Sequence, residues 1–267
     1  MKDSTGITDR SLLAGSAYKT AHDLAARQSL YQWQYPRYDL PAMVTDLLRD
    51  VRGTVVDVGC GNGRFLARLA QERPDLDLLG LDVSPGILKG LPQPVAVADA
   101  VRLPLRTESA DAALALHMLY HVADIPSAVA ELRRVLTGGG LLIASTNGAR
   151  DKAELDRLWR RAAGDVLGVD EGPERLSLSA RFSLEKAPDL LRTAFSDVTV
   201  VELPGTIRVT TPDPVIAHMN SYRAWAGQQG VPFETTVERA RHIVADRIDR
   251  DGAFEITCLG GLLVCTG

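Results

Sequence analysis

The chain has 267 residues, of which 45% are apolar and 24% charged, and its formal net charge is −4. This length can bury a sizeable core in one elaborated domain or two, and the composition excludes a disordered or fibrous chain. With no run of about 18 apolar residues and no basic-then-apolar leader, we expect a soluble cytoplasmic protein with no membrane partner.

Residues 54–147 alternate apolar runs of strand length with helical patterns. The runs are almost continuously apolar, which is typical of parallel strands covered on both faces. Strands are predicted at residues 54–58, 76–81, 94–98, 110–116 and 140–145, helices at 63–72 and 125–136, and a short turn at 85–88. Asp124 stands where the cap of the second helix should be, and Gly138 to Gly140 stop it. This alternation predicts an α/β fold with a doubly wound parallel sheet.

The pattern changes after Asn147. Helices are expected at residues 151–166 and 184–195, a strand at 198–203, and one or two helices at 214–248. The chain ends in "FEITCLGGLLVCTG", where Gly260 and Gly261 between β-rich runs suggest a tight hairpin or a glycine kink. Cys60, Cys258 and Cys265 form no Cys-x-x-Cys pair, so we expect three reduced thiols.

Three domains or segments are expected: an N-terminal helical lid at residues 1–50, a ligand-binding core at 51–150, and the rest of the sheet with helical cap insertions at 151–267. Residues 17–50 hold four of the six tyrosines and one of the three tryptophans. This concentration fits a lid, and it equally fits an N-terminal helix anchored on the core by aromatic residues.

The stretch "VVDVGCGNGRFLARLA", residues 55–70, runs from a strand through three glycines into an amphipathic helix. Gly59, Gly61 and Gly63 let the chain turn sharply and let a ligand approach the backbone and the free N–H groups of the helix. The dinucleotide spacing would require glycine at Arg64 or at Leu66, so neither register fits it. The P-loop is excluded as well, because no Gly-Lys-Ser/Thr follows.

Two carboxylates follow at the ends of the next strands. Asp82 ends the second strand, where it can accept hydrogen bonds from the vicinal hydroxyls of a ribose, and Asp99 ends the third, where it can accept one from an adenine amino group. Either residue alone is equally well explained as a helix cap. Together, after a glycine turn, they favour an adenosine-shaped ligand at the carboxyl edge of the sheet.

The segments "VVDVGCGNG", "LDVS", "VADAVRLPL" and "ALALHMLYHVADIPSAVAELRRVLTGGGLLIAS" resemble the successive motifs of the class I S-adenosylmethionine-dependent methyltransferases, in particular the small-molecule enzymes. The resemblance is close over residues 54–147. It implies a mostly parallel, seven-stranded Rossmann-like sheet with a helical cap or lid, S-adenosyl-L-methionine as cofactor, and methyl transfer to O, N or C of a small molecule such as a specialised metabolite.

The same resemblance assigns the cofactor site. Asp57 would support the glycine loop and approach the amino group, the turn would pass the methionyl part, Asp82 would hold the ribose, and Asp99 and Ala100 would flank the adenine. The implied cofactor-binding residues are Asp57, Gly59, Cys60, Gly61, Asn62, Gly63, Asp82, Val83, Asp99, Ala100, Leu116 and His117. The short segment after Asp82 leaves room for only a turn of helix, where the family usually has a full one.

A general base helps if the acceptor is a hydroxyl and is unnecessary for a free amine or an ionised carboxylate. The segment "LHMLYH" follows the strand whose end faces the methyl group. His117 and His121 are therefore the catalytic candidates, and they share one face if the segment is helical. The alternative is that His121 packs locally and His117 contributes only its backbone. No metal is expected, because no acidic third ligand accompanies the two histidines.

Substrate choice is expected to lie in the cap. The candidate substrate residues are Tyr18, Tyr31, Trp33, Tyr120, Tyr222 and Arg223. The insertion between the last two strands also carries His218 and Trp225, although a Tyr and a Trp three apart are commonly core anchors.

The main alternative within the same chemistry is an RNA methyltransferase. The acidic balance disfavours a nucleic acid partner, and the Asn/Asp-Pro-Pro-Tyr type of motif is absent. A noncatalytic S-adenosylmethionine-binding protein is the alternative of another class, and the glycine spacing disfavours a nicotinamide oxidoreductase. We expect a monomer or a homodimer.

Overall fold

The computed structural model describes residues 5–19, 22–92, 94–228 and 230–267. Within them runs one eight-stranded sheet of order β1-β7-β8-β6-β5-β2-β3-β4. Its strands are β1 (Gln34–Tyr35), β2 (Gly53–Val58), β3 (Leu76–Asp82), β4 (Val95–Val97), β5 (Ala110–Leu116), β6 (Leu136–Asn147), β7 (Asp197–Val209) and β8 (Phe254–Thr266). β2 to β6 are mutually parallel, and β8, β7 and β1 add antiparallel. The expected α/β, mostly parallel doubly wound sheet is confirmed, with the two-residue β1 as an additional strand.

Helices and short helical turns connect the strands along the chain. The α-helices are α1 (Thr5–Thr8), α2 (Arg10–Leu12), α3 (His22–Ser29), α4 (Leu40–Leu47), α5 (Arg64–Glu72), α6 (Ile125–Val135), α7 (Ala153–Leu167), α8 (Ala187–Leu191), α9 (Asp213–Asn220) and α10 (Phe233–Asp251). The π-helical turn η1 (Leu13–Ala17) and the 3₁₀ turns η2 (Leu30–Trp33), η3 (Leu119–His121), η4 (Ser179–Arg181) and η5 (Arg223–Gln228) join them. None of the described helices has the length and apolar character required to cross a bilayer.

Both faces of the parallel strands are covered. Along β2, Val56 belongs to the cluster of buried residues under α6 and α8, whereas its neighbour Val55 belongs to the cluster under α4 and α5. Successive side chains of a strand point to opposite faces, so a strand buried on both sides must be apolar throughout. This explains why the strands of residues 54–147 could be predicted from continuous apolar runs.

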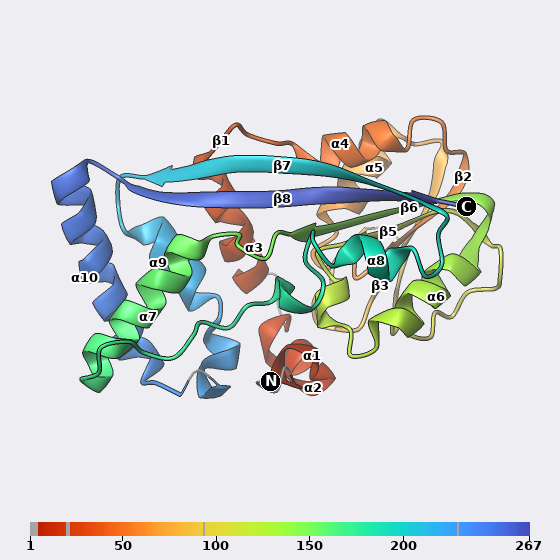
Figure 1. Ribbon diagram of the computed structural model, residues 1–267. Helices are drawn as coiled ribbons and strands as arrows, with labels where there is room; N and C mark the ends of the chain where they lie inside the picture. The colour runs from red at the N-terminus through yellow and green to blue at the C-terminus, as the bar shows by residue number, and fades with distance from the viewer. Residues whose placement is uncertain (1–4, 20–21, 93, 229) are drawn as a thin grey trace.

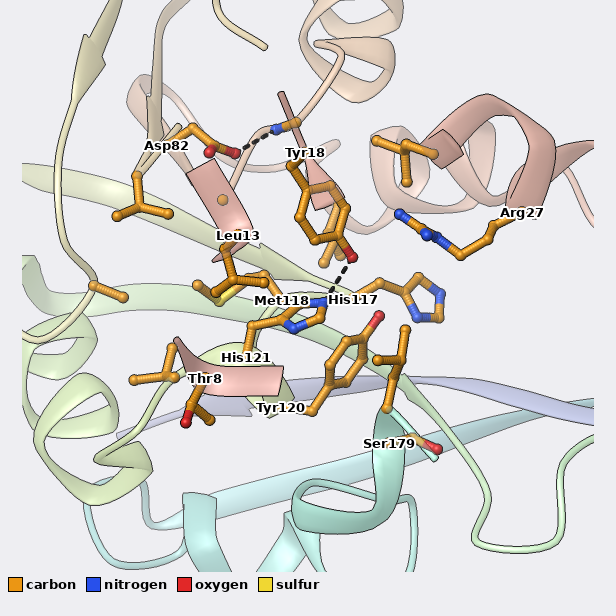
Figure 2. A pocket seen from close by; sticks show the side chains of 18 of the residues that line it. Thr8, Leu13, Tyr18, Arg27, Asp82, His117, Met118, Tyr120, His121 and Ser179 are labelled. Atoms are coloured by element: carbon orange, nitrogen blue, oxygen red, sulfur yellow. Dashed lines mark hydrogen bonds between the residues drawn. The ribbon is translucent and has the colours of Figure 1, made fainter. Parts of the chain in front are cut away.

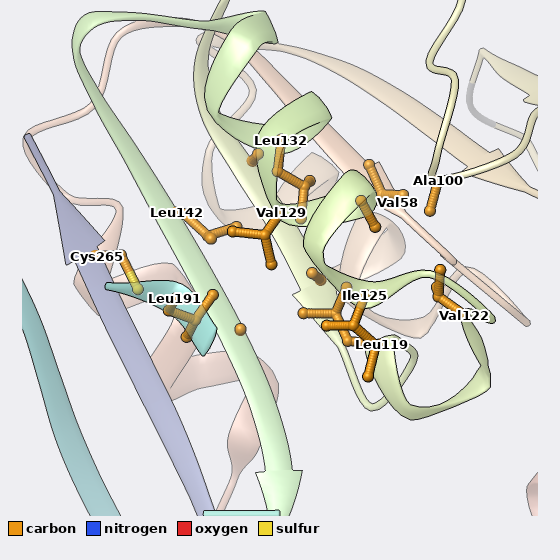
Figure 3. Packing of buried hydrophobic residues seen from close by; sticks show 14 of the residues in the cluster. Val58, Ala100, Leu119, Val122, Ile125, Val129, Leu132, Leu142, Leu191 and Cys265 are labelled. Carbon is orange, nitrogen blue, oxygen red and sulfur yellow. The ribbon is translucent and has the colours of Figure 1, made fainter. Parts of the chain in front are cut away.

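Helix α6 illustrates how local signals set an element. The Asp124 carboxylate accepts hydrogen bonds from the backbone N–H of Ser127 (3.1 Å) and from its hydroxyl (2.6 Å), which caps the helix as expected. Val129 and Leu132 then pack toward Leu142 of β6 (Figure 3). The helix ends at Val135, and β6 begins at the next residue, before the glycines that were expected to stop the helix.

A second core lies at the far end of the long strands β7 and β8, where α7, α9 and α10 gather (Figure 1). Trp159 of α7 packs against Phe233 of α10, with ring centroids 5.8 Å apart, and Ile207 and Ile256 join them from the two strands. The strand expected at residues 198–203 is longer in the structure, where it is β7, because its second half packs against the helices of this second core. We call this second core with its three helices the lobe of α7, α9 and α10. The expected insertion between the last two strands becomes α9, η5 and α10.

Two predictions for the C-terminal part are wrong. There is no hairpin at Gly260 and Gly261, because β8 is one continuous strand paired on both sides at these positions. A β-carbon on Gly261 would lie 2.7 Å from Leu184 Cδ2 and 3.0 Å from the Val201 carbonyl oxygen, so this glycine gives room for packing instead of forming a turn. The helix expected at residues 184–195 is restricted to the five residues of α8. The three cysteines are buried and free, as predicted.

Candidate active site

A cavity of about 320 Å³ lies at the carboxyl ends of the parallel strands, between the glycine turn and the helices of the N-terminal segment and the cap (Figure 2). Pockets of this size hold small molecules and cofactors, and the carboxyl edge is the usual ligand site of an open α/β sheet. Its wall includes Tyr18 of the N-terminal segment and Tyr222 of the C-terminal insertion. The two segments are also joined beside the cavity, since Trp225 of η5 donates a hydrogen bond through Nε1 to the Gly6 carbonyl (3.1 Å). The N-terminal segment and the C-terminal insertion thus close the cavity together.

The glycine turn between β2 and α5 needs its glycines. Gly59, Gly61 and Gly63 have φ angles of +73°, +54° and +71°, which L side chains rarely adopt. A β-carbon on Gly59 would also meet Met118 at 2.7 Å. The turn is fixed from β3, because the N–H groups of Gly59 and Cys60 donate to the Leu81 carbonyl at 2.7 and 3.0 Å.

Asp57, at the end of β2, is 1% exposed, and neither of its carboxylate oxygens has a hydrogen-bond partner among the described residues. Burial, together with the nearby Asp82 carboxylate, raises the pKa of Asp57 to about 7. The resemblance implies that Asp57 supports the glycine loop. Among the described residues, the Asp57 side chain makes no hydrogen bond to that loop. A buried carboxylate of this kind is costly unless a cation or a donor reaches it.

Asp82 supports the loop instead. Its Oδ2 accepts from the Gly61 N–H and its Oδ1 from the Ser84 N–H, both at 2.9 Å. Burial raises the pKa of Asp82, and the hydrogen bonds from these backbone donors offset part of that rise. Each carboxylate oxygen keeps a further lone pair, so a pair of hydroxyls can still be accepted.

Asp99, after β4, forms an ion pair with Arg10 of α2 and accepts a hydrogen bond from the Val101 N–H (3.1 Å). The Arg10 pair ties the N-terminal segment to the outer end of the cavity, next to Ala100. The three acids Asp57, Asp82 and Asp99 all line this half of the cavity, which we call the acidic half.

His117 has a φ angle of +54°, and its N–H donates to the carbonyl (3.1 Å) and the hydroxyl (3.0 Å) of Ser145. Burial, reinforced by the Lys152 charge, lowers the pKa of His117 to about 4, so the ring is neutral at pH 7. Within the described part of the chain its ring nitrogens have no hydrogen-bond partner. The segment is not helical at this position, so His117 and His121 do not share a helix face.

His121, in η3, has both ring nitrogens bonded. Nδ1 lies 2.9 Å from the Ile7 carbonyl and Nε2 lies 2.7 Å from the Tyr18 hydroxyl (Figure 2). A carbonyl only accepts, so Nδ1 carries the proton, and Tyr18 donates to Nε2. Burial lowers the pKa of His121 to about 4 and raises that of Tyr18, so both groups are neutral at pH 7.

The other half of the cavity carries cations that sequence reasoning missed: Arg27, Lys152 and Arg175. Burial disfavours the charge of Lys152, but the Asp151 carboxylate at 2.5 Å outweighs this and keeps its pKa above the ordinary value. These residues have no motif spacing in the sequence, because only the meeting of α3, α7 and the loop at Arg175 brings them together. We call this part the basic half.

Most predicted site residues do meet at the cavity. Those that line it are Asp57, Gly59, Cys60, Gly61, Asn62, Asp82, Val83, Asp99, Ala100, Leu116, His117, His121, Tyr18, Tyr31, Tyr120 and Tyr222. Gly63, the N-cap residue of α5, is not among the lining residues. Trp33 and Arg223 lie outside: Trp33 is 42% exposed, and Arg223 pairs with Glu234 and lies over the Phe233 ring.

Comparison with known proteins agrees with this geometry. A methyltransferase domain model matches residues 56–144. A tRNA (carboxymethyluridine(34)-5-O)-methyltransferase of Arabidopsis thaliana is 32% identical over 148 residues, which is 51% of this chain and 36% of that protein. A malonyl-[acyl-carrier protein] O-methyltransferase of Hahella chejuensis is 33% identical over 125 residues (44% and 42%), and a demethylmenaquinone methyltransferase of Roseiflexus castenholzii is 39% identical over 112 residues (39% and 47%). The chain spans less than half the length of each.

Solved structures share the fold over most of the chain. The YcgJ protein of Bacillus subtilis superimposes with a TM-score of 0.53 at 15% identity, covering 85% of this chain and 97% of that one. A phosphoethanolamine N-methyltransferase 2 of Haemonchus contortus, in complex with S-adenosyl-L-methionine, gives 0.53 at 15% identity, covering 96% of this chain and 59% of that one.

The sheet order, the glycine turn and the strand-end acids define the fold of the class I S-adenosylmethionine-dependent methyltransferases. Within that fold, residues 56–144 match the model of a methyltransferase domain, and the long β7 and β8 with α7, α9 and α10 lie beyond the matched residues.

Proposed function

We propose that the chain is a cytoplasmic enzyme that transfers the methyl group of S-adenosylmethionine to an oxygen, nitrogen or carbon atom of a small molecule. The observation that carries the proposal is the buried Asp57 carboxylate in the acidic half of the cavity, unpartnered among the described residues and next to a glycine turn. An ammonium group on a ligand is the partner that would offset its burial. The buried free thiols fit a reducing compartment.

The acidic half fits the cofactor group by group. Asp57 would hold the amino group, the remaining lone pairs of Asp82 would accept the two ribose hydroxyls, and Asp99 with Ala100 would flank the adenine. Gly59 and Gly61 would let the methionyl part pass close to the backbone, since neither has a side chain that would fill the space.

Bound S-adenosylmethionine would supply a methyl group on a positively charged sulfur, which keeps the electron pair of the broken C–S bond when the acceptor atom takes the methyl. The chain has to align the acceptor and exclude water. The hydrogen bond from Trp225 to Gly6 and the packing of buried Leu13 and half-buried Tyr18 would close the cavity for this purpose.

If the acceptor is a hydroxyl, its proton needs a base. His117 is neutral at pH 7, and its ring nitrogens are without a partner in the described residues, so it can take the proton directly. The Nε2 lone pair of His121 is already engaged by Tyr18. We therefore assign the base to His117 and a positioning role to His121, which orients the Tyr18 phenol.

The proposal is tested by release of S-adenosylhomocysteine from S-adenosylmethionine over a panel of small phenols, amines and carboxylates, with transfer RNA as a further acceptor. We expect turnover with at least one small-molecule class. Binding of S-adenosylhomocysteine without turnover over the whole panel would favour a noncatalytic binding protein. Turnover with transfer RNA alone would favour an RNA methyltransferase, which the similarity to the Arabidopsis enzyme keeps as the second candidate.

A further inference from the structure

The cofactor groups placed in the acidic half, namely the amino group, the ribose and the adenine, use none of the three cations of the basic half. Lys152 is paired with Asp151, and its Nζ also donates to the Tyr31 hydroxyl at 2.7 Å. Arg175 pairs through Nε with Asp156 at 2.8 Å. Arg27 is different, because it is 8% exposed and has no carboxylate within ion-pair distance in the described residues.

The partners of Arg27 are neutral. Its Nη1 donates to the Ser221 carbonyl at 2.8 Å, and its guanidinium carbon lies 4.9 Å from the ring centroid of Tyr18 and 5.8 Å from those of Tyr222 and Trp225. In Figure 2 the guanidinium of Arg27 points from α3 toward Tyr18. Rings and a carbonyl compensate a buried cation only in part, so an anion would stabilise it further.

Four unpartnered polar nitrogens belong to three side chains that surround the Tyr222 ring. Arg27 Nη2, Arg175 Nη1 and both ring nitrogens of His218 are buried with no hydrogen-bond partner among the described residues. The Tyr222 ring centroid lies 5.8 Å from the Arg27 guanidinium carbon, 5.3 Å from that of Arg175 and 5.4 Å from the His218 ring centroid. All three groups line the cavity, so the two free guanidinium nitrogens can donate to one occupant of it. Burial lowers the pKa of His218, so its ring is neutral and adds one further donor and one acceptor.

Resting on the proposed function, we infer that the methyl acceptor is a small aromatic anion whose carboxylate or phosphate is bound by Arg175 and Arg27 beside His218. Guanidinium groups match the oxygens of both anions in geometry and charge. The body of the acceptor would lie among the Tyr18, Tyr120 and Tyr222 rings, between the anion site and the acidic half. The cavity is thus acidic where the cationic cofactor is assigned and basic where the acceptor binds.

The test is calorimetric and uses the chain saturated with S-adenosylhomocysteine. Four probes share one ring and differ in charge: benzoate, phenyl phosphate, benzyl alcohol and benzylamine. We expect at least one anion to bind at least tenfold more tightly than the alcohol, and the amine to bind most weakly. The tighter of the two anions identifies the class. Equal affinity for the alcohol or the amine would overturn the inference, and this comparison needs no variant to fold.

Variants then locate the anion. Arg175→Met and His218→Phe should each lower the affinity for the preferred anion about tenfold, while the affinity for benzyl alcohol stays within twofold. Arg208→Met is the matched control, because Arg208 is an exposed arginine of β7 paired with Glu255 at 3.6 Å. Unchanged anion affinity in Arg175→Met, with S-adenosylhomocysteine still bound, would contradict the assignment.

The variant Arg27→Met shows whether Arg27 binds the acceptor or the cofactor. If Arg27 binds the acceptor, the variant loses anion affinity and keeps its affinity for S-adenosylhomocysteine. If the variant loses affinity for S-adenosylhomocysteine but not for 5′-methylthioadenosine, which lacks the amino acid part, Arg27 holds the cofactor carboxylate and its assignment to the acceptor is wrong. Failure of wild-type chain to bind S-adenosylhomocysteine would instead contradict the proposed function.

Discussion

At the scale of single residues, the sequence placed the acids and the glycines of the site but not its cations. Asp57, Asp82 and the glycine turn stand at fixed intervals after strands, so their meeting at one edge follows from the parallel sheet. Arg27 and Arg175 meet only because the N-terminal segment and the cap fold over the sheet. No spacing in the sequence indicates that these two distant arginines lie close together, and an isolated arginine is typical of a solvated surface.

Asp57→Asn should stabilise the ligand-free chain and weaken the binding of S-adenosylhomocysteine about tenfold or more. The folded state raises the pKa of Asp57 to about 7, so the unfolded state ionises first, and stability falls as pH rises from about 4 to 7. The gain from the asparagine should therefore be larger at pH 8 than at pH 5, by about 2 to 3 kcal/mol in urea unfolding. The control is Asp77→Asn, an exposed acid of β3. Equal gains at both pH values would contradict a raised pKa.

His117→Asn should lower kcat for a hydroxyl acceptor about 100-fold or more and leave the affinity for S-adenosylhomocysteine within threefold. Asparagine is chosen because it tolerates the φ of +54° at this position. A neutral amine acceptor attacks through its free lone pair and needs no base for the transfer, so it should be methylated at an almost unchanged rate. Full activity of the variant on hydroxyls would remove His117 as the base.

At the scale of elements, apolar periodicity was sufficient for the strands and helices of residues 54–147. It failed for Gly260 and Gly261, since glycine serves tight packing as well as turns and the sequence does not distinguish the two. Gly261→Ala should lower the free energy of unfolding by about 1 to 3 kcal/mol, because the new β-carbon meets Leu184 and the Val201 carbonyl. Gly260→Ala is the matched control, as its nearest neighbour outside the adjoining residues, Asn147 Oδ1, would be 3.5 Å away. Equal losses in urea unfolding would contradict this packing.

We propose that the N-terminal segment acts as a lid, held at its outer end by the ion pair between Arg10 and Asp99. Arg10→Ala should then speed the dissociation of S-adenosylhomocysteine several-fold in stopped-flow measurements. Arg49→Ala, which removes an exposed arginine of the α4–β2 connection paired with Asp46 and Asp50, should leave the rate unchanged. The same rate in both variants would show that the segment anchors the fold without gating the cavity.

At the scale of the whole molecule, one cavity joins the proposed cofactor and acceptor sites, with acids at the carboxyl ends of β2, β3 and β4 and cations where α3, α7 and α9 meet. The parallel half of the sheet was predictable because each strand is buried on both faces. The lobe of α7, α9 and α10 was predictable only as helices, since its position depends on the length of β7 and β8, which no local signal sets.

The central claim is that the acidic half binds the adenosine and amino acid groups of S-adenosylmethionine. Calorimetric titration with S-adenosylhomocysteine, with NAD as the comparison ligand, tests it most directly. We predict micromolar or tighter binding of S-adenosylhomocysteine, none of NAD at the same concentrations, and at least a tenfold loss in Asp82→Ala. Absence of binding by the folded chain, or an affinity that Asp82→Ala leaves unchanged, would contradict the assignment.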